Sequence, residues 1–248
     1  MMRCIAVLLF LLGVAVFSAQ DVVAQVPSLD KLLPAGDGSA SGRVLQLLML
    51  LTVLSIAPGL VIMVTCFTRF VIALSFLRAG LGLQTTPANL ILISLALFMT
   101  FYVMAPTMDR AWEDGIKPLM ESKISEQDAF TRAGRPFKAF MLANVRSKDL
   151  TLFEDLASEK LKTKPGSEIE MRVLIPAFMI SELRRGFEIG FLIVLPFLVI
   201  DLIVATLTMS MGMMMLSPTV LSLPFKLLFF VLIDGWNLIV GGLIRSFG

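Results

Sequence analysis

Charge is distributed very unevenly along this chain, and no other feature constrains its folding more. Of the 40 charged residues, 27 fall within residues 109–185, of which 14 are basic and 13 acidic. Residues 44–68 and 79–108 carry no charge, and about 20 apolar residues are enough for a helix to cross a bilayer. The pattern predicts an all-α, polytopic membrane-type protein. Two apolar helical hairpins, at 44–108 and 186–248, flank a charged extramembrane helical segment.

The composition excludes most enzyme chemistry. Hydrophobic residues make up 57% of the chain and charged residues 16%, against about 25% charged in ordinary globular proteins. There is no histidine, and the two cysteines are Cys4 and Cys66, which argues against imidazole bases, catalytic triads and clustered metal ligands. The chain has no glycine-rich phosphate loop, and its basic residues do not cluster as in nucleic-acid binding. We expect no enzyme activity, no cofactor, no metal and no nucleic-acid partner.

Residues 1–24 have the features of a secretory signal peptide. Arg3 is basic, residues 4–17 are apolar, and residues 22–24 resemble a small-residue cleavage site. The alternative is an uncleaved first helix. A cleaved signal would place the following chain outside the cytoplasm, and residues 25–43 would then form a linker.

Proline and glycine predict where the first apolar hairpin is interrupted. Pro58 and Gly59 lie in the middle of the first uncharged stretch. Because proline removes an intrahelical hydrogen bond, we expect two half-helices or a re-entrant bend there. The second strong helix is expected to begin at Asn89 and to end near Pro106. Arg69 either marks a cytoplasmic end by the positive-inside rule or, as we favour, snorkels or pairs at a helix end.

The charged segment is predicted to contain amphipathic helices outside the membrane. Apolar residues recur at helical spacing within residues 125–130, 135–146 and 149–161. The candidates for buried positions are Phe130, Phe137, Phe140, Met141, Leu150, Phe153 and Leu156. A cleaved signal followed by two crossings would put this segment outside the cytoplasm.

The second apolar hairpin contains a methionine-rich break between two apolar runs. Pro176 is expected to open the helix that leads into the break, and Pro218 follows the methionines. Methionine is unbranched and polarisable, so it fills irregular gaps and can repack. The methionines are therefore either ordinary core filler or a deformable seal in a pore. The members of this cluster are Met209, Met211, Met213, Met214 and Met215.

Asp201 and Lys226 lie on opposite sides of the methionines, at nearly equal distance along the chain. If the segment folds back as a hairpin, they reach the same level, and a buried charge without a partner is costly. We therefore favour a structural ion pair. Asp201 could instead be a proton-relay group or an ion ligand, since an acid within a membrane is a functional candidate by default. The helix carrying Lys226 and Asp234 is expected to be buried against other helices, and Asp234, Gly235 and Trp236 are assigned to packing.

Two stretches carry a family resemblance. PAFMISELRRGFEIGF, at 176–191, and PFKLLFFVLIDGW, at 224–236, resemble the two signatures of the FliP family of bacterial type III export apparatus proteins. Neither departs from the family pattern, and APGLVIMVTCFTRFVIALSFLR and PFLVID…MGMMM…PFK are similar to it as well. The resemblance covers nearly all of residues 44–247. The signal-like beginning and the long charged segment match the flagellar branch of the family.

The resemblance implies an all-helical subunit of which five copies assemble with FliQ and FliR around a narrow export channel, beside FlhA and FlhB. It implies a place at the flagellar basal body in the bacterial inner membrane, with the charged segment on the periplasmic side and unfolded export substrates as cargo. Met213, Met214 and Met215 would line the constriction, and the assembled helices need not span the bilayer as hydropathy suggests. The residues expected in packing or at subunit interfaces are Pro58, Gly59, Arg69, Glu182, Phe187, Gly190, Asp234, Gly235 and Trp236.

Two functions therefore remain open. The first is a non-enzymatic pore subunit for the export of unfolded proteins. The second is a proton-coupled or small-ion transporter that uses Asp201. A transporter should show internal repeats or several polar groups at mid-depth, and the sequence has no clear repeat and only Asp201, Lys226 and Asp234 at such positions. A membrane enzyme is disfavoured because no nucleophile–base pair or metal-ligand set can be assembled.

Overall fold

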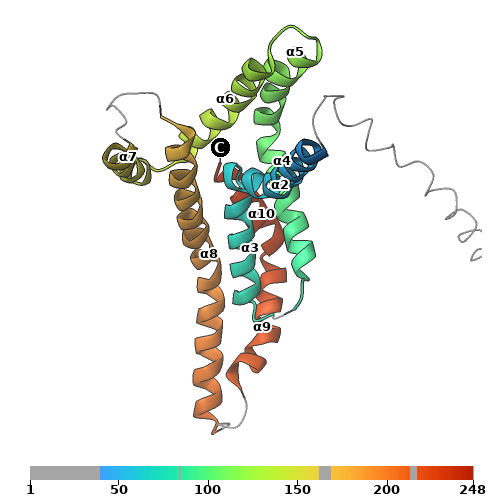
Figure 1. Ribbon diagram of the computed structural model, residues 1–248. Helices are drawn as coiled ribbons and strands as arrows, with labels where there is room; N and C mark the ends of the chain where they lie inside the picture. Colours follow the sequence, from blue (N-terminus) through green and yellow to red (C-terminus); the bar gives the residue numbers. More distant parts are fainter. Residues whose placement is uncertain (1–39, 84, 162–168, 213–216, 248) are drawn as a thin grey trace, which may run out of the picture. The chain divides into compact units, whose positions relative to one another are not determined.

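The structure, a computed structural model, describes residues 40–83, 85–161, 169–212 and 217–247 (Figure 1). Every regular element in these ranges is helical, so the predicted all-α fold class is confirmed. The predicted signal peptide and most of the linker lie outside the described residues. The elements are α2 (Ala40–Val64), α3 (Phe67–Gly80), α4 (Asn89–Ala111), the π-helix η3 (Trp112–Ile116), α5 (Lys117–Met120), α6 (Glu126–Asn144), α7 (Ser147–Leu161), α8 (Met171–Ser210), α9 (Pro218–Leu232) and α10 (Gly235–Arg245).

The chain divides into two compact units, Met1–Ser55 and Ile56–Gly248. In the first unit, the described residues form the beginning of α2. The predicted interruption of this helix at Pro58 and Gly59 is wrong, because α2 is one helix through both positions. The chain is interrupted one to two turns later instead, at Thr65 and Cys66. A proline removes a single intrahelical hydrogen bond, and long apolar helices tolerate that loss.

The second unit is organised around α3 and α8, which pack side by side in parallel (Figure 1). The helices are parallel, because residues later in α3 contact residues later in α8. Glycines allow the close approach, because a Cβ at each would meet a side chain of the other helix at 3.2 Å or less. The facing pairs are Gly186 with Ile72, Gly190 with Phe76, and Gly80 with Val194 and Phe197.

Adding a single methyl group at Gly190 is expected to destabilise this packing. In Gly190→Ala the new Cβ would lie 2.6 Å from Cγ of Phe76, so the helices must move apart. Overpacking of this kind costs about 1–3 kcal/mol, measurable as a lower melting temperature in detergent. Gly241→Ala is the matched control, because a Cβ there meets nothing within 4 Å and alanine favours a helix. Equal melting temperatures for the two variants would contradict close packing at Gly190.

Two predicted helix ends are wrong for the same reason. α4 begins at Asn89 as predicted, but it continues through Pro106 to Ala111, and helical structure extends to Met120. α8 begins at Met171, so Pro176 lies inside the helix instead of opening it. Each proline removes one donor from the helical hydrogen-bond series without ending it. A proline in the sequence therefore marks a weakened position, which the packing of the helix can override.

In the charged segment, α6 and α7 cover the predicted amphipathic stretches. Met141 of α6 is fully buried against Leu174 and Phe178 of α8, as its spacing predicts. Two predicted core residues are wrong: Phe130 is 85% exposed and Leu156 is 42% exposed. The face of α6 that packs on η3 is instead built from small side chains, since a Cβ at Gly115 would lie 2.7 Å from Cβ of Ala133. Phe130 is excluded from that face by its direction on the helix.

The remaining predicted core residues of the charged segment are partly buried. Three of them pack against a buried cluster, and the fourth is half-buried on α7. They are Phe137, Phe140, Leu150 and Phe153.

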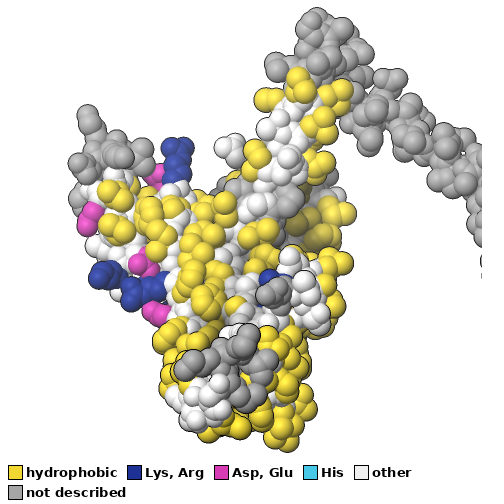
Figure 2. All heavy atoms as spheres, turned by 90° about the horizontal axis from the view of Figure 1, so that it is seen from below, with side chains coloured by type: hydrophobic (Ala, Val, Ile, Leu, Met, Phe, Trp, Pro, Cys, Tyr) yellow, Lys and Arg dark blue, Asp and Glu magenta, His cyan; other side chains and the backbone are white. Residues whose placement is uncertain are grey.

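Among the described residues, two helical segments are long and apolar enough to cross a membrane, Asn89–Met120 and Met171–Ser210. The pair α9 and α10, bent by 64°, forms a third if counted as one span. The face of the molecule seen end-on in Figure 2 is mostly hydrophobic, with most of its Lys, Arg, Asp and Glu side chains on one side. At about 1.5 Å per residue, the 40 residues of α8 are about 60 Å long, twice the thickness of the hydrocarbon core. Five charged residues, Arg172, Glu182, Arg184, Arg185 and Glu188, lie in its first half, so only residues 189–210, about 33 Å long, have the composition of a membrane span.

Candidate functional site

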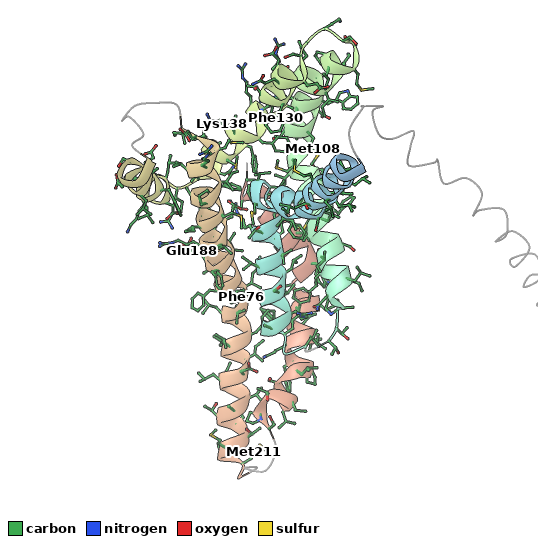
Figure 3. All side chains as sticks on the ribbon, in the orientation of Figure 1. Phe76, Met108, Phe130, Lys138, Glu188 and Met211 are labelled. Carbon is green, nitrogen blue, oxygen red and sulfur yellow. The ribbon has the colours of Figure 1, made fainter. Side chains whose placement is uncertain are left out.

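The methionine-rich segment joins α8 to α9 in a helical hairpin, as predicted. α8 ends at Ser210, Gly212 adopts a left-handed backbone conformation with a φ of +75°, and α9 begins at Pro218. Met209 and Met211 are 63% and 72% exposed. Figure 3 shows Met211 at this end of α8, at the opposite end of the unit from Phe130. The other three methionines of the cluster, Met213, Met214 and Met215, lie outside the described residues.

An apolar groove separates α8 from α9 next to this turn. Its volume is about 570 Å³, and its lining contains no charged side chain among the described residues. The lining residues are Ile200, Ile203, Val204, Leu207, Thr208, Met211, Leu221, Phe225 and Phe229. The end of the hairpin is therefore uncharged and loosely packed within one chain.

Asp201, Ser222 and Lys226 form a polar clamp that connects α8 and α9 to the end of α3. Lys226 Nζ lies 2.6 Å from Asp201 Oδ2 and donates a second hydrogen bond, 3.0 Å long, to the carbonyl oxygen of Gly80 at the end of α3. Ser222 Oγ donates to Asp201 Oδ1 at 2.5 Å. The structure thus brings Asp201 and Lys226 together within one chain. Each oxygen of the Asp201 carboxylate accepts one hydrogen bond within the chain, which supports a structural pair.

A second ion pair, between α3 and α8, is entirely buried. Arg69 and Glu182 have no exposed side-chain surface, and Arg69 Nε and Nη2 donate to the two carboxylate oxygens of Glu182 at 2.9 and 2.5 Å. Bidentate pairing of this kind is strong and geometrically specific. Both residues were predicted to serve in packing, but their pairing was not predicted. The available signal was the spacing of Glu182, four residues before Gly186, on the small-residue face of the helix.

Two further residues complete the surroundings of Arg69 and were missed by sequence reasoning. Its Nη1 donates to the carbonyl oxygen and to Oγ of Ser246, both at 2.9 Å. Its guanidinium carbon lies 3.4 Å from the centroid of the Phe247 ring. No pattern in the sequence links positions this far apart, because α3 and the turn after α10 meet only through the tertiary fold.

The other residues predicted for packing have separate places. Phe187 makes an edge-to-face contact with Phe76, with ring centroids 5.3 Å apart, and Gly190 lies under the same Phe76 ring. A Cβ added at Gly59 would meet no atom of the chain within 4 Å. Any packing role for Gly59, and with it the role predicted for Pro58, therefore stays a prediction.

Asp234, Gly235 and Trp236 form the bend between α9 and α10. Asp234 is left-handed, with a φ of 51°, a conformation in which Asp and Asn are enriched. The helix that carries Lys226 and Asp234 was expected to be buried against other helices; Lys226 is buried, whereas Asp234 is exposed within the chain and precedes α10 as its N-cap, so its interface role stays a prediction. A Cβ on Gly235 would lie 2.3 Å from the Phe230 ring, and Trp236 packs edge-on against the same ring. These contacts support a packing role for Gly235 and Trp236.

No group of three or more His, Cys, Asp or Glu side chains converges as a metal site in the part of the chain that the structure describes. The candidate site is the end of the hairpin of α8 and α9, which is uncharged and loosely packed. The polar clamp holds this hairpin to the end of α3.

Comparisons with known proteins identify the family. The sequence model of the FliP family matches residues 50–243. The chain is 66% identical over 212 residues to the "Flagellar biosynthetic protein FliP" of Rhizobium meliloti (strain 1021), covering 85% of this chain and 86% of the relative. The protein of the same name from Agrobacterium fabrum is 61% identical over 98% of this chain and 97% of its own length. That of Bacillus subtilis (strain 168) is 53% identical over 82% and 91%. The chain therefore belongs to the FliP family.

Proposed function

We propose that this chain is a pore-forming subunit of the flagellar type III protein export gate, which passes unfolded flagellar proteins across the inner membrane without catalysing a reaction. The names of the relatives place those proteins in flagellar biosynthesis, and the all-helical, membrane-type fold suits a channel. The observation that carries the proposal is the hairpin of α8 and α9. Its end is uncharged and loosely packed, with exposed methionines, as a deformable seal requires.

Assembly into a ring or helix of subunits is supported by the extent of the apolar surface. Exposed apolar side chains occur along α4, α8 and α9, among them Phe98, Phe191 and Leu228. Part of this surface, such as Phe187, is exposed on the first half of α8, which also carries charged residues, and lipid is a poor cover for charged surface. We take other protein subunits as the remaining cover: five copies of this chain with FliQ and FliR, next to FlhA and FlhB.

The orientation rests on the predicted signal peptide, because a cleaved signal followed by two crossings puts the charged segment outside the cytoplasm. The segment with α6 and α7 lies at the opposite end of α8 from the turn into α9 (Figure 1). We assign the charged segment to the periplasmic side, so the methionine-rich end faces the other way. Substrates would meet the seal before they reach the part of the channel formed by the charged segments.

Replacing Met213, Met214 and Met215 together with alanine is expected to open a leak to ions and small molecules. Alanine lacks the long, flexible side chain that closes irregular gaps, while export of flagellar proteins should survive in part. The measurement is the collapse of an ion gradient in cells or proteoliposomes that contain the assembled gate. Met120→Ala, a change at an exposed methionine of α5, serves as the control. A triple variant that holds the gradient as tightly as the unmodified protein would show that the seal lies elsewhere.

A further inference from the structure

The turn that follows α10 is inserted between α3 and α6. Leu243, at the end of α10, is buried, and the next residues, Ser246 and Phe247, pack against Arg69. This contact belongs neither to the methionine-rich hairpin nor to the Asp201–Lys226 clamp. It is also not needed for the interaction of Arg69 with Glu182, which uses other donor atoms of the guanidinium.

The Phe247 ring is held by three different partners. The guanidinium of Arg69 stacks on it, with the guanidinium carbon 3.4 Å from the ring centroid. The ring of Phe140 stacks on it, with centroids 6.0 Å apart and planes inclined by 22°. Phe70 meets it edge to face at 5.4 Å. Phe247 thereby links α3, which contributes Arg69 and Phe70, to α6, which contributes Phe140.

The same ring of Phe140 continues the contact into α8. It meets Phe178 edge to face at 6.0 Å, and the next residue of α6, Met141, is completely buried in the cluster around Phe178. The second half of α6 therefore contacts α8 directly and contacts α3 through the Phe247 ring. The first half of α6 is seated separately, on η3.

The hydrogen-bond donors of Arg69 explain why the turn after α10 packs at this place. Nε and Nη2 are satisfied by Glu182 as soon as α3 and α8 pack, but Nη1 is satisfied by Ser246. Arg69 has no exposed surface, and a buried donor left without a partner is unfavourable. Arg69 therefore attracts the turn after α10, and that turn brings the Phe247 ring to the place where Phe140 docks.

We infer that Arg69, Ser246, Phe247 and Phe140 form a clasp, by which the turn after α10 fastens the second half of α6 onto α3. The clasp does not rest on the role in export. It makes the docking of the second half of α6 depend on the correct packing of α10, which lies more than 90 residues later in the chain.

The test follows the exposure of α6 by thiol labelling of the full-length protein in detergent. In a background with Cys4→Ala and Cys66→Ala, Met141→Cys reports on the docking of α6 and Met99→Cys reports on the helix core, since both methionines are buried. Adding Phe247→Ala should speed the labelling of Met141→Cys about tenfold or more, because the cation–π contact and two ring contacts are lost. The labelling of Met99→Cys should stay slow.

Phe187→Ala is the matched control, since this half-exposed ring contacts Phe76 outside the clasp, and it should leave the Met141→Cys rate unchanged. Phe247→Leu keeps an apolar side chain without the ring and should give a smaller increase. An unchanged Met141→Cys rate in Phe247→Ala would overturn the clasp. So would an equal rise at Met141→Cys and Met99→Cys in both Phe247 variants, because the turn would then hold the whole bundle and not α6.

Discussion

Glu182→Ala is expected to lower the free energy of unfolding by about 3–5 kcal/mol, because it leaves a buried guanidinium without its carboxylate. Arg69 is completely buried and loses both hydrogen bonds to Glu182, while only those to Ser246 remain. Since natural domains are stable by about 5–15 kcal/mol, much of the protein should fail to fold or assemble. Denaturant titration in detergent and the yield of assembled complex would measure the loss.

Two further variants separate the energy of the pair from the cost of stranding one charge. The double variant Arg69→Met with Glu182→Leu removes both charges and keeps apolar bulk, so it should be less destabilised than Glu182→Ala alone. Glu188→Ala breaks an exposed pair with Arg184 on the same helix and should change stability little, since exposed pairs contribute little. If Glu182→Ala were no worse than Glu188→Ala, the buried pair would not be important for folding.

Asp201→Ala and Lys226→Ala should each block assembly and motility. The expected cost is again about 3–5 kcal/mol for stranding a buried charge, and the two variants should not be equal. Lys226 is 5% exposed and Asp201 27%, so removing Asp201 strands the more buried charge and should be the more damaging change. Native gels of the membrane extract and swimming assays would measure both effects.

The charge swap Asp201→Lys with Lys226→Asp should recover part of the assembly and motility. Recovery stays incomplete because a carboxylate at position 226 would face the carbonyl oxygen of Gly80, which now accepts a hydrogen bond from Lys226. A complex that assembles fully while lacking either charge would contradict the structural role of the pair.

Asp201→Asn distinguishes the pair from the transporter alternative. A proton-relay role for Asp201 forecasts a complex that assembles normally but does not transport. The structural pair forecasts a defect in assembly, since the amide cannot balance the charge of Lys226. The two outcomes are read on the same native gel together with an export assay.

The sequence alone predicted the features that depend on local pattern. Long uncharged stretches against one charged segment predicted an all-helical, membrane-type chain, and helical spacing predicted α6 and α7. The beginning of α4 at Asn89 and the hairpin around the methionines followed from turn residues and apolar runs. The pairing of Asp201 with Lys226 was foreseeable because a hairpin brings residues at equal distance from its turn to one level, but only the structure shows that they meet within one chain.

The sequence misled at the prolines and at Phe130. Prolines at positions 58, 106 and 176 were expected to interrupt, end or begin helices, yet each lies inside one, because a proline removes only one hydrogen bond from a long helix. Phe130 was expected in the core, but small side chains form that contact, since close helix packing leaves no room for a ring.

Only the tertiary structure decided which distant residues meet. Arg69 and Glu182 are 113 positions apart, and they pair because glycines let α3 and α8 pack closely in parallel, which sets the register between them. Ser246 and Phe247 reach the same place only after α10 bends away from α9 at Asp234 and Gly235. Local periodicity specifies which face of a helix is apolar. It does not specify which other helix covers that face, because the apolar faces of different helices are chemically alike. Here the close approach allowed by single glycines decides which helices pair.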